Sequence, residues 1–210
     1  STDTVTVKTA DGAETGFAGG SAVAKINGTY ELRDSKDAQS GKALYLNGNA
    51  SNYLSVTDEA GKSLLAGKEE ITISYDEKPD QTGTSWVFYA APNENAQVNA
   101  KEHYIGAFHN NGNIKVERYN NTNGRPASIE ESAGTDWAHI DVVFKSTETI
   151  LYVNGIRKST VASDYALPDI LGDSGIFYIG RANWVNGEGY KGWIDNFKVY
   201  DGALTDEDLV

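Results

Sequence analysis

The feature that most restricts the fold of this chain is an alternation of apolar and polar residues with a period of two. Side chains on a β-strand point to opposite faces in turn, so this period predicts strands with one buried face. Asn-Gly pairs at Asn47-Gly48, Asn111-Gly112 and Asn154-Gly155 separate some of the alternating stretches. Asn-Gly favours the positive φ angles that a two-residue hairpin turn requires. The predicted strands are Thr4–Lys8, Lys42–Asn47, Tyr53–Val56, Glu70–Asp76, Ser85–Ala90, His103–His109, Ile114–Tyr119, His139–Lys145, Thr149–Val153, Gly175–Ile179 and Trp193–Tyr200.

Many short strands joined by turns predict an all-β, two-sheet antiparallel sandwich of the jelly-roll kind, with residues 1–210 as a single domain. The 22 glycines suit frequent chain reversals. Only two short helices are expected, at Ser63–Ala66 and from Asp206 onward. Thr205 resembles an N-cap, because acidic residues fill the turn that follows it. The chain stops soon after this cap, so we expect it to continue in a longer polypeptide.

The acidic composition restricts the partners of the chain. The formal net charge is −12 and the isoelectric point is near 4.6. Lysine and arginine do not cluster, so a nucleic acid partner is not expected. No apolar run approaches the roughly 20 residues that span a bilayer, and insertion into a membrane is not expected either. Neutral ligands are the expectation, although the acidity alone also keeps a protein soluble.

The chain contains no cysteine. A four-cysteine zinc site, a thiol nucleophile and a disulfide framework are therefore excluded. This composition fits an exported bacterial protein, although cytosolic proteins can also lack cysteine, and we expect a secreted or cell-surface protein. A monomer is the default expectation.

The last third of the chain carries an ordered series of motifs. They are Asp136–Phe144, Leu151–Gly155, Phe177–Arg181, Gly192–Asp201 and Ala203–Thr205. Together they resemble the laminin-G-like, concanavalin A-like jelly roll that accompanies secreted bacterial glycoside hydrolases. An additional segment, Asn113–Asn120, is similar to modules found beside arabinan- and xylan-active enzymes. The resemblance covers residues 40–210 well and the first 40 loosely.

This resemblance implies a non-catalytic carbohydrate-binding module, attached to an enzyme that degrades plant or host polysaccharide. It would hold that enzyme near its substrate and so raise the effective concentration. Two alternatives stay open: a spacer domain without a ligand, and an adhesin-type module for a host glycan or a protein. Sialic acid would be favoured if Arg118, Arg125 and Arg181 converged in one pocket.

The acidic residues do not match a glycosidase pattern. Retaining hydrolysis needs two carboxyl groups roughly 5 Å apart, which on one strand requires acidic residues at positions i and i+4 of the same face. The adjacent pairs Asp76-Glu77 and Glu130-Glu131 point to opposite faces in a strand and are expected in loops. The three histidines also lack the spacing of a metal triad or a nucleophile–base pair. His103 and His109 remain candidates for lining a ligand groove, so no catalytic residue is predicted.

Alternation places Asp195 on the face of Trp193–Tyr200 that also carries Trp193 and Phe197. A carboxylate on a core-facing surface needs a cation, backbone N–H donors or a shared proton. The resemblance implies a structural Ca²⁺ near the meeting point of the first and last strands. Asp11 and Glu14 would supply the further oxygen ligands, while hydrogen bonds to a turn would satisfy Asp195 equally well.

A glycine- and asparagine-rich loop at residues 180–190 is the first candidate ligand site. Aromatic rings stack on the apolar faces of sugars, while amides and guanidinium groups bind the hydroxyls. A tryptophan in such a loop either binds a ligand or packs under its own loop. The candidate residues are Arg181, Asn183, Trp184 and Tyr190.

A second candidate site combines a hairpin tip with the strand end that follows it. Its amides and arginines suit hydroxyl or carboxylate recognition, but they equally suit a polar hairpin end. The residues are Asn110, Asn111, Arg118, Tyr119 and Arg125. Four other aromatic residues are interpreted as core or fold-signature positions, namely Trp86, Phe88, Trp137 and Trp193.

Overall fold

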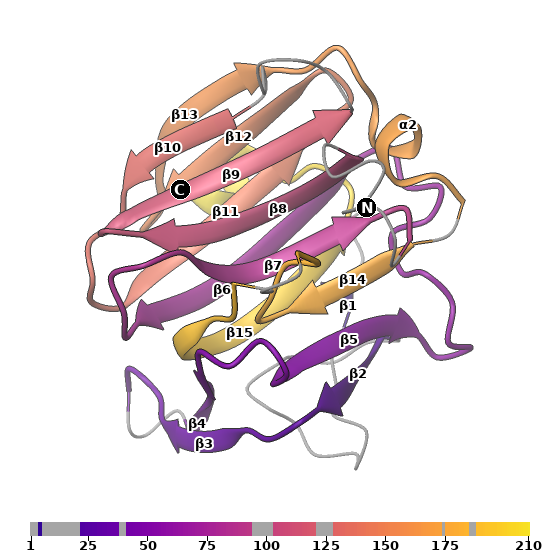
Figure 1. The fold of residues 1–210 in the computed structure, drawn as a ribbon. Coiled ribbons are helices and arrows are strands. Elements are labelled where there is room, and N and C mark those ends of the chain that lie inside the picture. Colours follow the sequence, from indigo (N-terminus) through magenta and orange to yellow (C-terminus); the bar gives the residue numbers. More distant parts are fainter. Residues whose placement is uncertain are drawn as a thin grey trace.

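Two antiparallel β-sheets stack face to face in the computed structural model of this chain (Figure 1). The structure describes residues 4–5, 22–37, 41–93, 103–120, 128–173, 175–184 and 188–210. The eight-stranded sheet has the order β13-β12-β11-β6-β15-β4-β3, with β1 paired to β15. Its strands are β1 (Thr4–Val5), β3 (Glu31–Asp34), β4 (Lys42–Asn47), β6 (Ile71–Pro79), β11 (Ala138–Phe144), β12 (Glu148–Val153), β13 (Ile156–Ala162) and β15 (Lys191–Asp201).

The seven-stranded sheet has the order β10-β9-β8-β7-β14-β5-β2 and forms the front layer of Figure 1. Two short helices, α2 (Leu167–Leu171) and α3 (Asp206–Leu209), complete the described elements. The strands of this sheet are β2 (Ala22–Asn27), β5 (Tyr53–Asp58), β7 (Ser85–Ala91), β8 (His103–Asn110), β9 (Asn113–Asn120), β10 (Ser128–Ser132) and β14 (Ile176–Ile179). The all-β jelly-roll prediction is confirmed.

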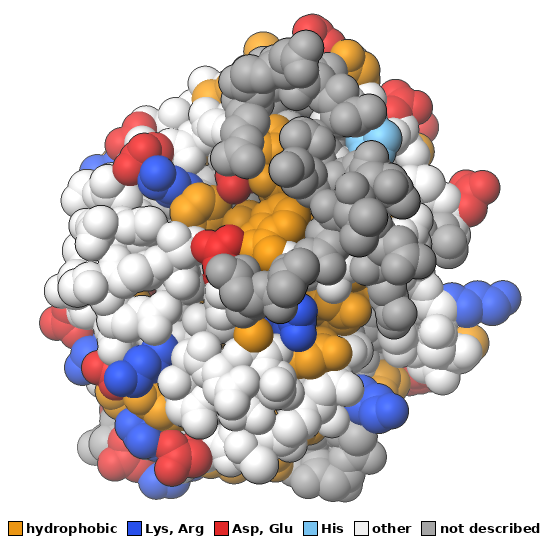
Figure 2. All heavy atoms as spheres, in the orientation of Figure 1, with side chains coloured by type: hydrophobic (Ala, Val, Ile, Leu, Met, Phe, Trp, Pro, Cys, Tyr) orange, Lys and Arg blue, Asp and Glu red, His pale blue; other side chains and the backbone are white. Residues whose placement is uncertain are grey.

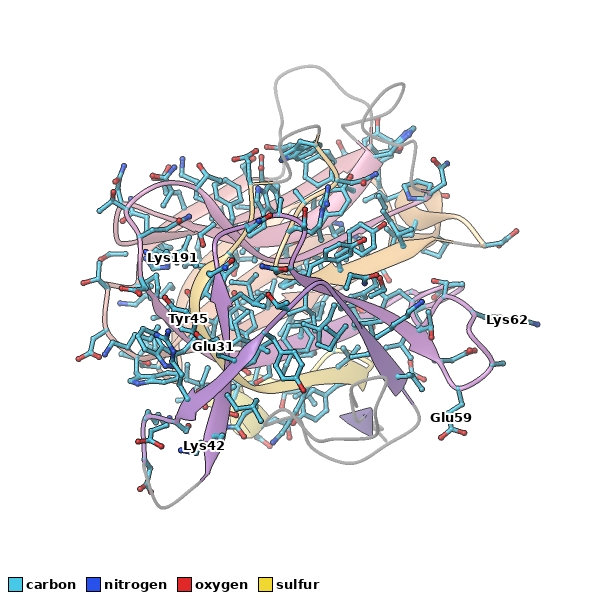
Figure 3. The ribbon with its side chains drawn as sticks, turned by 60° about the horizontal axis from the view of Figure 1, so that its bottom comes forward. Glu31, Lys42, Tyr45, Glu59, Lys62 and Lys191 are labelled. Atoms are coloured by element: carbon cyan, nitrogen blue, oxygen red, sulfur yellow. The ribbon has the colours of Figure 1, made fainter. Side chains whose placement is uncertain are left out.

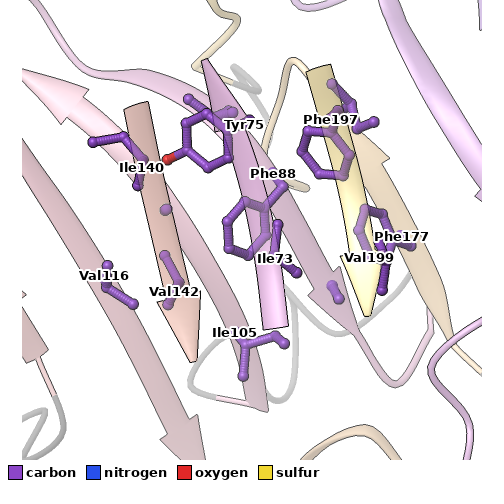
Figure 4. Packing of buried hydrophobic residues seen from close by; sticks show 14 of the residues in the cluster. Ile73, Tyr75, Phe88, Ile105, Val116, Ile140, Val142, Phe177, Phe197 and Val199 are labelled. Carbon is purple, nitrogen blue, oxygen red and sulfur yellow. The ribbon is translucent and has the colours of Figure 1, made fainter. Parts of the chain in front are cut away.

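The core fills the space between the sheets. Tyr75 of β6, Phe88 of β7 and Phe197 of β15 meet there, with ring centroids 5.9–6.3 Å apart (Figure 4). Each such side chain contributes about 1.5–3 kcal/mol by leaving water. The inward positions alternate with outward ones along the regular parts of the strands, as the period of two requires. The prediction that Phe88 is a core residue is confirmed.

Turn chemistry fixes two of the hairpins. At the β8–β9 turn Asn111 and Gly112 have φ angles of 51° and 79°, and at the β12–β13 turn Asn154 and Gly155 have 51° and 75°. These left-handed pairs make the two-residue turns that the sequence predicted. Asn47-Gly48 instead ends β4 and leads into a longer connection to β5.

Several predicted elements differ from the observed ones. Ser63–Ala66 forms bends and turns, not a helix, whereas the predicted helix at Asp206 is present as α3. Glu130-Glu131 lies in β10 and Asp76-Glu77 in β6, so neither acidic pair is in a loop. The strands β2, β3, β10 and β13 were not predicted, because their residues are too exposed or too mixed to show a clear alternation.

A bulge in β15 corrects the predicted orientation of Asp195. Asp195 pairs with Asp76 while Lys198 pairs with Ser74, so β15 carries one extra residue, and Asn196 takes a φ of 49°. The alternation therefore changes phase. Asp195 faces outward from the sandwich although Phe197 faces the core, and Trp193 lies outside the core as well.

A polar cluster joins the two sheets inside the core. Glu77 of β6 is fully buried, and its carboxylate oxygens lie 3.0 Å from His109 Nδ1 and 3.2 Å from the Tyr190 hydroxyl. The Tyr190 hydroxyl donates to Glu77 and also lies 3.0 Å from the carbonyl oxygen of Trp193. Burial raises the pKa of Tyr190 well above its ordinary value, and the charge of Glu77 adds to the rise. Tyr190, at 1% exposure, and His109 are thus core residues, and neither lines a groove as predicted.

Candidate functional site

The outer face of the seven-stranded sheet carries a second aromatic cluster, separate from the core, which we call the aromatic face. Its central rings are Trp86 and Tyr89 of β7 and Tyr104 of β8, with centroids 5.3–6.0 Å apart. Further members are Phe108, Tyr119 and Tyr178, and Tyr53 packs against them. Figure 2 shows hydrophobic side chains at the surface near the middle of this face, with acidic and basic groups beside them.

A bulge in β7 brings Trp86 and Tyr89 to the same face. Trp86 pairs with Phe108 and Phe88 pairs with Ala107, so Val87 is the extra residue. In a regular strand, residues three positions apart such as Trp86 and Tyr89 point to opposite faces of the sheet. The extra residue in the bulge shifts the alternation by one, so both side chains point to the same face. The sequence predicted Trp86 as a core or fold-signature residue. In the structure it lies at the centre of the aromatic face, outside the core between the sheets.

Gly106 makes room for the Trp86 indole. A Cβ atom at position 106 would lie 2.6 Å from Trp86 Cζ3 and 2.8 Å from the carbonyl oxygen of Phe88. Real Cβ atoms do not approach other atoms so closely. The ring can lie against β8 only because this residue has no side chain.

Trp184 caps the cluster from the predicted loop. Its ring is edge-on to Trp86, Tyr89 and Tyr104, with centroids 5.2–5.7 Å away, and it stays partly exposed. Arg181 fixes the loop, because its guanidinium donates to the carbonyl oxygens of Ala50 and Ala182 at 2.9 and 2.7 Å. The indole of Trp184 both packs on the face and presents part of its surface to solvent.

Two buried donors lie on the aromatic face. The hydroxyl of Tyr89 has no hydrogen-bond partner within the described part of the chain. The indole N–H of Trp86 makes no hydrogen bond of good geometry there, but it interacts with the Glu188 side chain. A buried polar group without a partner costs about 1–3 kcal/mol. Such a group beside a partly exposed ring is suited to a ligand or to water that bonds with it.

Two glutamates border these rings. The hydroxyl of Tyr119 donates to the Glu117 carboxylate, and the backbone N–H of Trp86 donates to the carbonyl oxygen of Glu188. Burial raises the pKa of Glu188, the charge of Glu117 raises it further, and the neighbouring Trp86 and Thr84 oppose part of this rise. Glu188 has a φ of 45°, which costs a residue with a side chain about 1 kcal/mol. This glutamate is held in a backbone conformation that glycine adopts without strain.

The structure brings some residues of the two predicted ligand sites together on the aromatic face and places the others elsewhere. Trp184 and Tyr119 both contact Tyr104, at 5.2 and 5.0 Å between centroids. Asn183 is buried next to Trp184, whereas Tyr190 belongs to the core. Asn110 and Asn111 secure their hairpin by bonding Thr84 and the carbonyl oxygen of Thr82. Arg125 lies outside the described residues.

Arg118, a predicted ligand residue, faces the core side of β9 and not the aromatic face. It is 2% exposed, and its guanidinium donates to the carbonyl oxygens of Lys145, Glu148 and Tyr165 at 2.8, 3.2 and 2.8 Å. Burial lowers its pKa to about 10. The sequence contained the signal for this orientation, since Arg118 has the same parity as the core residues Ile114 and Val116. The three arginines proposed for an anionic sugar therefore do not converge, as far as the described residues show.

Asp195 is already satisfied by hydrogen bonds. It accepts one from the Ser35 hydroxyl and one from the backbone N–H of Asn196, while burial and the charge of Asp76 contribute to raising its pKa. Within the described ranges no three His, Asp or Glu side chains form a metal-binding group. Asp11 and Glu14 lie outside those ranges, so the calcium site stays a prediction.

An acidic pair holds His139 on the outer face of the eight-stranded sheet. His139 Nε2 lies 3.2 Å from Asp141 Oδ2, and His139 Nδ1 lies 2.7 Å from Asp76 Oδ1. These carboxylates raise the pKa of His139 to about 9. Lys36 and Asn196 also contact Asp76, at 3.7 and 2.8 Å.

We expect the stability of the fold to fall between about pH 6.5 and pH 9.5. The raised pKa stabilises the folded state fully below the ordinary histidine pKa of about 6.5, and this contribution disappears as pH rises through 9. Its size should be about 1–2 kcal/mol, because His139 is 38% exposed and solvent screens the pairs. Urea unfolding at pH values of about 6 and about 9.5, on either side of this window, measures it. His139→Gln should remove the difference in unfolding free energy between the two pH values. If the variant loses as much stability as the wild type, His139 is not the group responsible.

The family comparison agrees with this architecture. Residues 47–210 match the model of the concanavalin A-like lectin/glucanases superfamily. The chain belongs to this superfamily. No curated protein matches the sequence significantly.

Solved structures with the same superfamily fold include binding domains of several kinds. Domain 4 of AbnA, an extracellular arabinanase from Geobacillus stearothermophilus in complex with arabinotriose, is 19% identical with a TM-score of 0.63, covering 99% of this chain and 85% of that one. The CBM40 domain of Ruminococcus gnavus IT-sialidase, bound to α2,3-sialyllactose, is 15% identical with a TM-score of 0.59, covering 68% and 80%.

A third relative in structure binds a protein. The binding domain of botulinum neurotoxin DC, in complex with rat synaptotagmin II, is 16% identical with a TM-score of 0.63, covering 90% of this chain and 45% of that one. Identities this low establish the shared fold and leave the ligand of this chain open. None of the helices in the described ranges has the length and apolar character needed to traverse a bilayer.

A pocket away from the aromatic face is less suited to a ligand. It has a volume of about 410 Å³, lies against β3 and β4, and is lined in part by Tyr30, Glu31 and Tyr45. Figure 3 labels Glu31 and Tyr45 among these residues. Arg33 covers the Tyr45 ring at 3.4 Å from its centroid and pairs with Glu31 at 2.7 Å. The Tyr45 hydroxyl donates to Asp80. Because these groups satisfy one another, the aromatic face is the stronger candidate.

Proposed function

We propose that this chain is a non-catalytic glycan-binding module that acts from the aromatic face. The observation that supports it most is the partly exposed Trp184 lying over Trp86, Tyr89 and Tyr104, next to the unsatisfied hydroxyl of Tyr89. Sugar rings stack on aromatic surfaces through their C–H groups, and their hydroxyls accept and donate hydrogen bonds. The named relatives bound to arabinotriose and sialyllactose are consistent with this role.

The proposed module serves an attached, exported polysaccharide-degrading enzyme. Weak binding to the polymer would keep the tethered enzyme near its substrate and raise the effective concentration. Few stacked rings and a few hydrogen bonds that compete with water give a modest net affinity. The sandwich itself performs no chemical step in this proposal.

Replacing Trp184 by alanine is expected to weaken glycan binding by about 10- to 100-fold. A partly exposed tryptophan at the centre of a binding surface typically contributes this much. A glycan array identifies the ligand, and calorimetry with the best-bound glycan measures the change. Trp193→Ala is the matched control. Trp193 is also partly exposed, but it packs on Tyr45 in the eight-stranded sheet, away from the aromatic face.

Two results would contradict this function. Equal binding by the wild type and Trp184→Ala would remove the aromatic face as the site. Release of sugar by the purified chain, abolished by Glu117→Gln or Glu188→Gln, would make the chain an enzyme, since these carboxylates are close enough to interact.

A protein ligand is the second candidate function. The neurotoxin binding domain with synaptotagmin shows that this fold also recognises proteins. A chain that binds no glycan on an array, yet loses a protein partner in Trp184→Ala, would support this alternative.

A further inference from the structure

The aromatic face is more accessible on one side of Trp184 than on the other. Towards β9, the rings of Tyr104 and Tyr119 are each only 1% exposed. Towards β5, the side chains of Tyr53 and Arg181 are both partly exposed. A ligand that stacks on Trp184 can therefore continue over β14 towards β5.

Tyr178 of β14 connects these two regions. It pairs with Tyr89 in the register between β14 and β7, and its ring centroid lies 4.9 Å from that of Tyr53. Tyr89 in turn contacts the Trp184 ring, with centroids 5.4 Å apart. Because β14 separates β7 from β5, and neighbouring strands lie about 4.8 Å apart, these two strands are about 10 Å apart. This distance is longer than one sugar ring, so a ligand that reaches both strands contains more than one unit.

Arg181 and Tyr53 together form a surface that suits a second sugar unit. The guanidinium lies over the Tyr53 ring, 5.0 Å from its centroid. Three of its five N–H groups donate to the carbonyl oxygens of Ala50, Ala182 and Trp184. The other two make no hydrogen bond within the described ranges, and they are able to donate to sugar hydroxyls while the ring contacts C–H groups.

We infer that Tyr53 and Arg181 form a second subsite and that the ligand is an oligosaccharide chain lying across β7, β14 and β5, an inference that rests on the proposed function. Trp184 binds one unit of this chain, and the Tyr53–Arg181 pair binds another. Covalent linkage gives the second unit a high effective concentration once the first is bound, so both contacts contribute to affinity. The site therefore prefers a segment of a chain to a single sugar.

The test measures affinity as a function of chain length. The tightest binder on the glycan array is prepared as a homologous series from one unit upward. Calorimetry measures each member, and weak members are measured by displacement of the longest. Affinity is expected to rise at least about 10-fold between one unit and the length that spans both subsites, and to level off beyond it. Equal affinity at every length would overturn the inference.

Variants of Tyr53 connect this rise to the second subsite. Tyr53→Ala removes the ring, so its longest ligand should bind no more than about 3-fold tighter than the single unit. Tyr53→Phe keeps the ring and should keep the rise. Tyr200→Ala is the matched control and should also keep it, because Tyr200 is a partly exposed strand residue on β15 of the other sheet. A full rise in folded Tyr53→Ala, checked by circular dichroism, would overturn the assignment to Tyr53.

The outcomes separate this inference from the function on which it rests. Affinity that depends on Trp184 but not on chain length overturns the second subsite and leaves the glycan-binding function in place. An array without any bound glycan overturns both.

Discussion

Replacing Arg118 by methionine is expected to lower the free energy of unfolding by about 3–4 kcal/mol. The guanidinium donates to three backbone carbonyls within 3.2 Å and to a fourth, that of Ser146, at 3.5 Å. Methionine fills a similar volume without any donor. Each lost hydrogen bond to a buried acceptor costs about 1–1.5 kcal/mol. The bonds also join β9 of one sheet to the turn between β11 and β12 of the other, so both sheets lose a connection. Urea unfolding followed by tryptophan fluorescence measures the change.

The control for this variant is Arg157→Met. Arg157 lies on β13, is 43% exposed and contacts Asp206 at 3.5 Å, so its loss should change stability by less than about 1 kcal/mol. Glycan affinity of the folded Arg118→Met protein should equal that of the wild type. If the Arg118→Met protein is stable but no longer binds glycan, Arg118 is a ligand-binding residue after all.

Glu77→Ala is expected to destabilise the fold by about 3–5 kcal/mol. The substitution leaves His109 Nδ1 and the Tyr190 hydroxyl facing a small cavity in the core. Removing one partner of a buried polar group typically has an effect of this size. The second nitrogen of His109 already lacks a partner within the described residues, so the ring cannot compensate there.

Glu77→Gln separates the contribution of the hydrogen bonds to stability from the contribution of the side chain's volume. Glutamine keeps the length of the side chain and one acceptor, so it should cost about 1–2 kcal/mol. Denaturant unfolding of both variants under the same conditions gives the comparison. If alanine and glutamine destabilise the protein equally, the hydrogen bonds of Glu77 do not hold the sheets together.

The fold could be predicted because its local signals agree. Alternation marked the strands with one buried face, and Asn-Gly at residues 111–112 and 154–155 defined two hairpins by backbone chemistry alone. Edge strands such as β3 and β13 escaped prediction, because solvent exposure on both faces removes the apolar signal. The short helix α2 escaped as well, since five residues are too few to show a period.

The site could be predicted only in part. Trp184 and Tyr119 were found because a loop tryptophan and a polar strand end are visible in the sequence. Trp86 was missed because the bulge at Val87 changes the phase of β7, and a ladder irregularity depends on the partner strand. Glu117 and Glu188 were missed because they come from separate elements, and only the fold brings them together.

The close approach of the Trp86 indole to Gly106 gives a criterion for dividing other members of the superfamily into two groups by sequence. Any side chain at the equivalent position would occupy the volume that the Trp86 indole fills here. A sequence with glycine there and tryptophan at the equivalent of residue 86 is able to build the same ring platform. A sequence with a larger residue there has no room for an indole in this position, so one alignment column separates the two groups.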